Sequence, residues 1–166
     1  MQQDRSIALA RLREELKRPP FHAVLRPRAI DADPDGGTVT IALDYRDELA
    51  RAPHDKSFHG GVIATLIDLT GHAAVAVKIG KMSPTIDLRI DYLRPSTGES
   101  IVARARLLKV GRMLARVDID VTDTDERLIA VGRGSFSTAS QPETEPAYRW
   151  TAIKGLGVSA PKVSYA

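Results

Sequence analysis

The feature that most constrains this chain is an apolar segment, residues 60–79, that precedes a series of alternating segments with short connections. Its sequence, GGVIATLIDLTGHAAVAVKI, is apolar on nearly every side, which predicts a helix buried over most of its surface. The segments that follow alternate apolar and polar residues, as half-buried strands do: 85–93, 100–110, 113–121 and 127–137. Because the turns between them are short, we expect antiparallel neighbours.

The residues before the apolar segment add a helix and one or two strands. Residues 4–17 have a rough apolar stripe, and Pro19-Pro20 ends this predicted helix. Residues 21–31 are weakly strand-like, whereas 38–44 alternate clearly as a strand. We therefore predict an α+β fold, in which an antiparallel sheet of roughly five to six strands wraps around one long central helix.

These patterns divide the chain into an N-terminal helix at 1–19, one domain at 20–138 and a C-terminal tail at 139–166. Charges in the first 17 residues do not fit a secretory signal, so we expect a cytoplasmic protein. The chain has no Cys, which excludes disulfides and thiolate chemistry, and its four His residues lack the spacing of a metal site. The net charge of +3 comes without a basic stripe, and no uninterrupted apolar run reaches membrane-spanning length. We expect neither a nucleic acid nor a membrane as partner.

Phe58-His59-Gly60-Gly61 marks the start of the apolar segment. The first N–H groups of a helix lack partners within it and lie at the positive end of its dipole, so they can bind an oxyanion. At Gly60 and Gly61 no side chain shields these groups. The alternative is that the glycines only make a tight turn or a close packing contact.

Asp68 is a carboxylate within this apolar segment. Carboxylates are rarely buried unless they are paired or have a function. One interpretation is structural: Asp68 pairs with His72, one turn further along, or bonds to Thr65. The other is catalytic, with Asp68 as a general base or nucleophile whose reactivity the apolar surroundings adjust.

Gly60 and Asp68 cannot serve one site within one chain. Their eight-residue separation corresponds to roughly 12 Å along a helix. A base and an oxyanion donor must each lie within about 3 Å of a reacting carbonyl. Two such helices packed antiparallel about a twofold axis would place Asp68 of one chain beside Gly60 of the other. The spacing therefore predicts a homodimer with two shared sites.

Four stretches make the chain resemble a known family: HGGVIATLID, TIDLRIDYLRP, KVGRMLARVDIDV and LIAVGRGSFS. In order and spacing, over residues 20–138, they are similar to the hotdog-fold acyl-CoA thioesterases of the phenylacetate-degradation (PaaI-like) type. The resemblance implies a dimer, often assembled into tetramers, in which Asp68 activates water or attacks the thioester. It implies that the Gly60 backbone and His59 of the other subunit polarise the carbonyl. A hydroxyl at the position of Thr85 is implied to hold the water or the Asp.

The chain departs from this family at Pro53. Many members have an Asn six residues before the HGG histidine, where its carboxamide contacts the thioester; here that position is Pro53, and the chain contains no Asn. His54 is a candidate replacement donor, and otherwise the site relies on the Gly60 N–H. His54 also lies fourteen residues before Asp68, which resembles the spacing in hotdog acyl-carrier dehydratases, but the Pro/Gly-rich loop of those enzymes is missing.

Several basic residues are candidates for binding a substrate phosphate. Lys109 and Arg112 flank a turn and Arg133 lies between two glycines, positions at which the resemblance implies contact with coenzyme A phosphates. A solvated turn is the alternative for each of them. Three further arginines alternate with aspartates on one predicted sheet face and are expected to be structural: Arg89, Arg104 and Arg106.

Together these features predict a thioesterase that hydrolyses acyl-CoA to a carboxylic acid and free coenzyme A, as a homodimer or homotetramer, with no metal or other cofactor. The predicted catalytic residues are Asp68, Gly60, His59 and Thr85. The predicted substrate-binding residues are Gly61, His54, Lys109, Arg112 and Arg133. The alternatives are a non-catalytic acyl-CoA-binding hotdog module and a hotdog dehydratase that uses His54 and Asp68.

Overall fold

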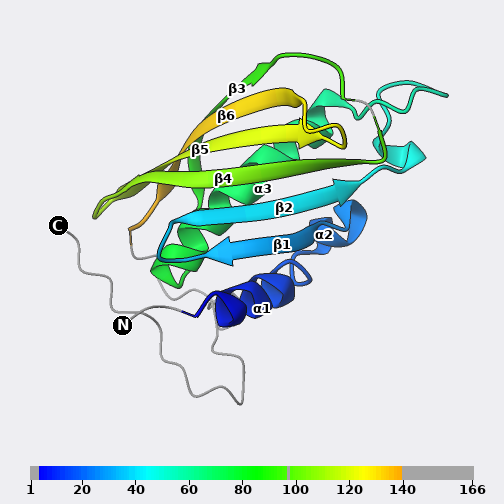
Figure 1. Cartoon of the computed structure of the whole chain (residues 1–166). Helices are drawn as coiled ribbons and strands as arrows, with labels where there is room; N and C mark the ends of the chain where they lie inside the picture. The colour runs from blue at the N-terminus through cyan, green and yellow to red at the C-terminus, as the bar shows by residue number, and fades with distance from the viewer. Residues whose placement is uncertain (1–3, 97, 140–166) are drawn as a thin grey trace.

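The computed structural model describes residues 4–96 and 98–139, so the predicted tail lies outside the described residues from position 140 onward. In order, the elements are α1 (Arg5–Glu15), α2 (Pro20–Leu25), β1 (Arg28–Asp33), β2 (Thr38–Asp44), the 3₁₀ turn η1 (Asp47–Leu49), α3 (Gly60–Ile79), β3 (Thr85–Tyr92), β4 (Ser100–Val110), β5 (Leu114–Asp123) and β6 (Leu128–Ser137). The strands form one antiparallel sheet in the order β1-β2-β4-β5-β6-β3, and α3 lies against one face of it (Figure 1). The predicted fold, a six-stranded sheet around one long central helix, is confirmed.

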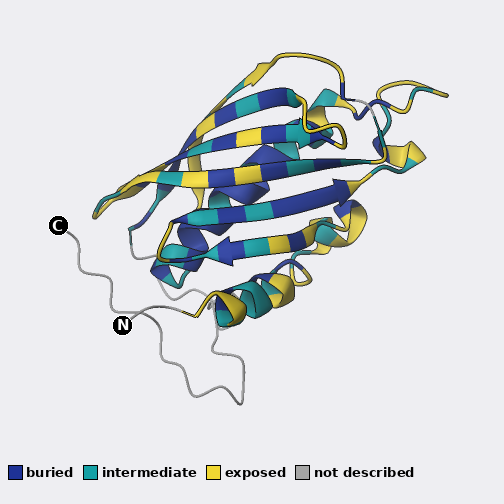
Figure 2. Ribbon diagram, in the orientation of Figure 1, coloured by how far each residue is buried: buried dark blue, intermediate teal, exposed yellow. Residues whose placement is uncertain are grey.

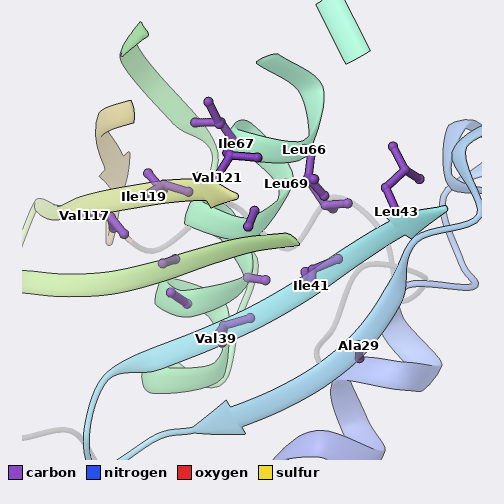
Figure 3. Packing of buried hydrophobic residues seen from close by; sticks show 14 of the residues in the cluster. Ala29, Val39, Ile41, Leu43, Leu66, Ile67, Leu69, Val117, Ile119 and Val121 are labelled. Carbon is purple, nitrogen blue, oxygen red and sulfur yellow. The ribbon is translucent and has the colours of Figure 1, made fainter. Parts of the chain in front are cut away.

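α3 is central because most of its surface meets the sheet. Side chains such as Leu66 and Ile67 pack among inward-facing residues of β2 and β5, including Ile41 and Ile119 (Figure 3). By length and a mean hydropathy of 1.6, α3 also meets a simple test for a membrane-spanning helix, but 67% of that window is buried inside the fold. A core helix of a globular domain passes the same test, so this finding is weak evidence for a membrane span.

Gly71 allows α3 to approach the sheet closely. A Cβ at this position would lie 2.6 Å from Cζ of Phe136, a fully buried ring on β6. The close approach holds α3 against the sheet in the middle of its length, between the two residues predicted to be catalytic and the end of the helix.

The strand expected over 21–31 is only partly correct. Pro20 occupies the first turn of a short helix, α2, where its fixed φ favours helical backbone and its missing N–H costs nothing. Arg26 then adopts a left-handed conformation with φ 56° and ends the helix, and β1 begins two residues later. Weak alternation in this segment therefore reflected a short helix followed by an edge strand.

The expectation that all four later strands are sequential neighbours is wrong for β3. β4, β5 and β6 pair in sequence, but β3 pairs with β6 at the far edge of the sheet. The connection over 93–99 must therefore cross about 14 Å, three strand spacings. Its residues can span that distance, since an extended chain advances about 3.3 Å per residue. The short connection between β3 and β4 therefore does not require these two strands to be neighbours in the sheet.

β3 is the more exposed edge of the sheet. Figure 2 shows it exposed along most of its length, whereas the strands beside it alternate buried and exposed residues. Its apolar side chains are not covered: Ile86 is 59% exposed and Tyr92 53%. The backbone N–H and C=O groups along its outer edge are also unpaired in the sheet. An edge strand with exposed apolar side chains and unpaired backbone groups can pair with a strand of another chain.

Candidate active site

His59 is the N-cap of α3 and determines which backbone donors remain free. Its Nδ1 accepts the Gly61 N–H at 2.9 Å, and its carbonyl accepts the N–H groups of Val62 and Ile63. Within the described part of the chain, the Gly60 N–H is left without a hydrogen-bond partner. The two glycines therefore differ: the Gly60 N–H is available to a ligand, whereas a ligand of the Gly61 N–H would have to displace the cap.

The same contact sets the tautomer of His59. Because Nδ1 accepts a hydrogen bond, it carries no proton, and the neutral ring has its proton on Nε2. The side chain is exposed at the start of α3. Its Nε2–H can therefore act as a second donor beside the Gly60 N–H.

Tyr92, at the end of β3, holds the first turn of α3 in place. Its hydroxyl donates to the Gly60 carbonyl at 2.9 Å, and its ring lies 3.6 Å from the point where a Cβ on Gly60 would be. Tyr92 lies within the strand expected over 85–93, but no local pattern in the sequence predicts a contact between residues 32 positions apart.

Asp68 lies on the same helix, two turns after Gly60, and is half-buried. Thr85 Oγ1 donates to its Oδ1 at 2.6 Å. The two structural alternatives are wrong: His72 Nδ1 contacts the Ser83 carbonyl, and Thr65 donates to a backbone carbonyl of its own helix. Among the described residues, Oδ2 of Asp68 has no hydrogen-bond partner, so this oxygen is free to accept a proton.

A β-bulge lies where Thr85 contacts Asp68. The register between β3 and β6 shifts between Thr85 and Asp87. Bulges of this kind redirect a side chain at the end of a strand and are frequent beside active sites. Thr85 is thus the first residue of β3 and also the residue that contacts the carboxylate of α3.

The two halves of the site lie at opposite ends of β3. Its first residue, Thr85, holds Asp68, and its last residue, Tyr92, holds Gly60. α3 is continuous between Gly60 and Asp68, so the two are separated by roughly 12 Å, as predicted. One chain therefore does not bring its own base and its own oxyanion donor to one carbonyl.

Lys109 and Arg112 lie at the same end of the sheet as Thr85. In the register, Thr85 pairs with Phe136, Phe136 with Ala115, and Ala115 with Val110, next to the turn between β4 and β5. Both basic side chains are exposed, and neither makes a hydrogen bond or ion pair with any described residue. They are free to meet an anionic group near this end of the molecule.

Arg133 is in a different situation. It lies in the middle of the outer sheet face and makes a two-pronged ion pair with Asp118 at 2.6 and 2.8 Å. The hydrogen bond from Arg133 lowers the pKa of the Asp118 carboxyl, and the same pairing raises the pKa of Arg133. Arg106 also approaches Asp118, and Arg89 pairs with Asp91, so this face is the solvated ladder of opposite charges that was expected. A phosphate would have to compete with Asp118 for Arg133.

His54 lies in the loop that precedes α3, in a left-handed conformation with φ 63°. Its side chain is exposed, and the structure shows no hydrogen bond between it and any described residue, Asp68 included. The described residues also contain no group of three or more His, Asp or Glu side chains placed to hold a metal ion.

Comparison with known proteins connects this geometry to a family. The family model described as the thioesterase superfamily matches residues 56–130, which include α3 and the strands β3, β4 and β5. A putative esterase of Halobacterium salinarum is 35% identical over 115 residues, covering 63% of this chain and 76% of the relative. Acyl-coenzyme A thioesterase 13 of mouse is 39% identical over 80 residues, which are 46% of this chain and 57% of the mouse enzyme.

The fold of the chain is also similar to that of a solved structure. The structure of the PaaI protein from the phenylacetic acid degradation operon of Escherichia coli superposes with a TM-score of 0.69, covering 81% of this chain and 98% of that protein at 20% identity. That likeness concerns the fold, whereas the more similar sequences carry the family assignment. The chain therefore belongs to the thioesterase superfamily: it is a hotdog-fold thioester hydrolase, and its fold is similar to that of the PaaI protein.

Proposed function

We propose that this chain hydrolyses acyl-CoA thioesters in sites that two subunits share. The observation that carries this proposal is the hydrogen bond from Thr85 to one oxygen of Asp68, which leaves the other oxygen free, on the same helix whose first N–H is free. The relatives support the substrate class, since the mouse protein is an acyl-coenzyme A thioesterase and an Escherichia coli relative is a medium/long-chain acyl-CoA thioesterase.

The arrangement of β3 supports a shared site. If two copies pair antiparallel along their exposed β3 edges, the Thr85 end of one strand lies against the Tyr92 end of the other. This brings Asp68, held by Thr85, toward the partner's Gly60, which is held by the partner's Tyr92. The pairing would also cover the apolar side chains that β3 exposes. A single twofold contact thus buries the edge and completes two sites.

In the proposed reaction, the thioester carbonyl accepts hydrogen bonds from the Gly60 N–H and from His59 Nε2–H of one subunit. Asp68 of the other subunit takes a proton from water through Oδ2, and the water oxygen attacks the carbonyl carbon. The tetrahedral intermediate then collapses: the carbon–sulfur bond breaks, and coenzyme A leaves as a thiolate that takes up the proton held by Asp68. The carboxylic acid that remains loses its proton to solvent. The products are a carboxylate and free coenzyme A, and water is the only co-reactant.

Release of free thiol from acyl-CoA tests the proposed function directly. Because the chain has no Cys, a thiol reagent will detect released coenzyme A without background from the protein. We expect release above the chemical blank for at least one of a short, medium, long or aryl acyl-CoA. If none is hydrolysed but acyl-CoA binds, the chain is a binding module.

Lys109 and Arg112 should contribute to affinity for the phosphates of coenzyme A and not to chemistry. Each exposed charge contributes up to about 1 kcal/mol, so Lys109→Ala with Arg112→Ala should raise the KM for acyl-CoA roughly tenfold and leave kcat within about twofold. The effect should shrink as salt is added.

Arg104→Ala is the matched control, because Arg104 is an exposed arginine of the outer sheet face without an ion pair to any described residue. It should change KM by less than about twofold. An acyl-pantetheine, which lacks the phosphates, should not distinguish wild type from the double variant. An equal loss with acyl-CoA and acyl-pantetheine would contradict phosphate binding by this pair.

A further inference from the structure

His72 connects the helix that carries Asp68 to the turn that carries Thr85. It lies one helical turn after Asp68 and is half-buried. Its Nδ1 lies 2.8 Å from the carbonyl oxygen of Ser83, two residues before Thr85. Since a carbonyl can only accept, Nδ1 is the donor and carries the proton.

The turn between α3 and β3 is held by three hydrogen bonds. His72 donates to the Ser83 carbonyl, Ser83 Oγ donates to the Ser137 carbonyl at 2.7 Å, and Ser137 N–H donates to the Pro84 carbonyl at 2.8 Å. The last two attach the turn to β6, whereas the first attaches it to α3. The position of Thr85 relative to β6 is therefore set by the sheet, and its position relative to Asp68 depends on His72.

The Ser83 carbonyl needs this donor. Ser83 is completely buried, so water cannot replace a missing partner. A buried carbonyl without a donor is costly, and the chain would move to relieve it. Because α3 ends at Ile79, with Gly80 as its C-cap, few residues separate the helix from Thr85, and a shift at Ser83 passes directly to the Thr85 hydroxyl.

We propose that His72 is a positioning residue for catalysis: its Nδ1–H fixes the Ser83 carbonyl, and thereby keeps Thr85 Oγ1 on Oδ1 of Asp68, so that Oδ2 faces the reacting water. The proposal rests on the proposed thioesterase function. It assigns His72 no contact with substrate. It explains why a polar ring lies within a largely apolar helix, on the same side as the carboxylate.

Two substitutions of His72 distinguish the effect of its hydrogen bond from the effect of its volume. His72→Asn keeps an N–H near the place of Nδ1–H, whereas His72→Leu fills similar space without a donor. We expect His72→Leu to lower kcat by about 10- to 100-fold with KM within about threefold, as for the loss of alignment at a reacting group. His72→Asn should restore kcat to within about threefold of wild type.

His22 provides the matched control. It is also a half-buried histidine with Nδ1 3.0 Å from a backbone carbonyl, that of Leu16, but this contact joins α1 to α2 and not to the turn before Thr85. Burial lowers the pKa of His22, and the hydrogen bond to the Leu16 carbonyl opposes this effect only in part. His22→Leu should leave kcat within about twofold of wild type if positioning of Thr85 is the function of His72.

A double-mutant cycle with Thr85→Val decides whether His72 acts through Thr85. Once the hydroxyl is gone, His72→Leu should lower kcat by less than about twofold further. Equal losses in both backgrounds, or no recovery with His72→Asn, would overturn the proposal. If His72→Leu does not fold, as judged by circular dichroism, His72→Gln replaces it, because its amide is displaced by one carbon from the place of Nδ1. An inactive wild type would contradict the proposed function, whereas an active wild type with an unimpaired His72→Leu would contradict only the role of His72.

Discussion

Asp68→Asn should lower kcat for acyl-CoA hydrolysis by at least ~100-fold, the usual scale for loss of a general base. The amide keeps the size of the carboxylate and can still accept the hydrogen bond of Thr85, but it cannot take a proton from water. The substrate contacts that we propose for Gly60, Lys109 and Arg112 are untouched, so the affinity for acyl-CoA should stay within a few-fold. Thiol release measures the first quantity, and equilibrium binding of acyl-CoA measures the second.

Asp120→Asn is the control for removal of a negative charge. Asp120 is exposed on the outer sheet face and forms no ion pair with another described residue, so its substitution should change kcat by less than about twofold. If Asp68→Asn retains activity within a few-fold of wild type, Asp68 is not the base. An unchanged affinity in a chain that never hydrolyses acyl-CoA would instead identify a binding module.

The central helix was predictable from the sequence because its start and its apolar surface are both local properties. His59 and Gly60 mark where it begins, and the length of the apolar run sets where it ends, at Ile79. The position of β3 was not predictable in the same way. Its alternation identified a strand, but its neighbour in the sheet depends on how residues 93–99 cross two other strands, which no local pattern records.

The residues of the site also fall into those that local sequence features predict and those that depend on contacts between distant positions. Asp68 was identified because a carboxylate is unusual in an apolar helix, and Gly60 because glycines leave a helix start unshielded. The sequence did not distinguish the two glycines, since that depends on which N–H His59 caps. Tyr92 and His72 were missed as parts of the site because their contacts join residues that lie 32 and 11 positions away in the chain. Thr85 was named from a family resemblance, and its contact with Asp68 is explained by the bulge at the start of β3.

Mixing two inactive variants should restore activity if each site is built from two subunits. Asp68→Ala lacks the base, and Gly60→Val places a branched side chain at the free N–H, against the ring of Tyr92. In a homodimer of either variant, both shared sites carry a lesion, so each variant should be nearly inactive. When the two are unfolded together in equal amounts and refolded, about half of the dimers should contain one chain of each kind.

A mixed dimer distributes its lesions unevenly. One of its two sites combines the chain that lacks the base with the chain that has the blocked N–H, and so collects both lesions. The other site combines the intact Asp68 with the intact Gly60. About a quarter of the wild-type activity should therefore return, since one site in two is intact in about half of the dimers. The same variants mixed without unfolding should stay inactive for as long as subunits do not exchange.

The alternative to a shared site is a site built from one chain, and the activity of the mixture distinguishes the two. If Gly60 and Asp68 of one chain served the same site, every site in a mixed dimer would carry one lesion, and mixing would restore nothing. That arrangement requires α3 to bring together two residues that its own length holds roughly 12 Å apart. Native mass spectrometry of the refolded mixture identifies the mixed dimers, because the two variants differ in mass. A mixture that contains them and still fails to hydrolyse acyl-CoA would overturn the shared site, while the hotdog fold of the single chain would be unaffected.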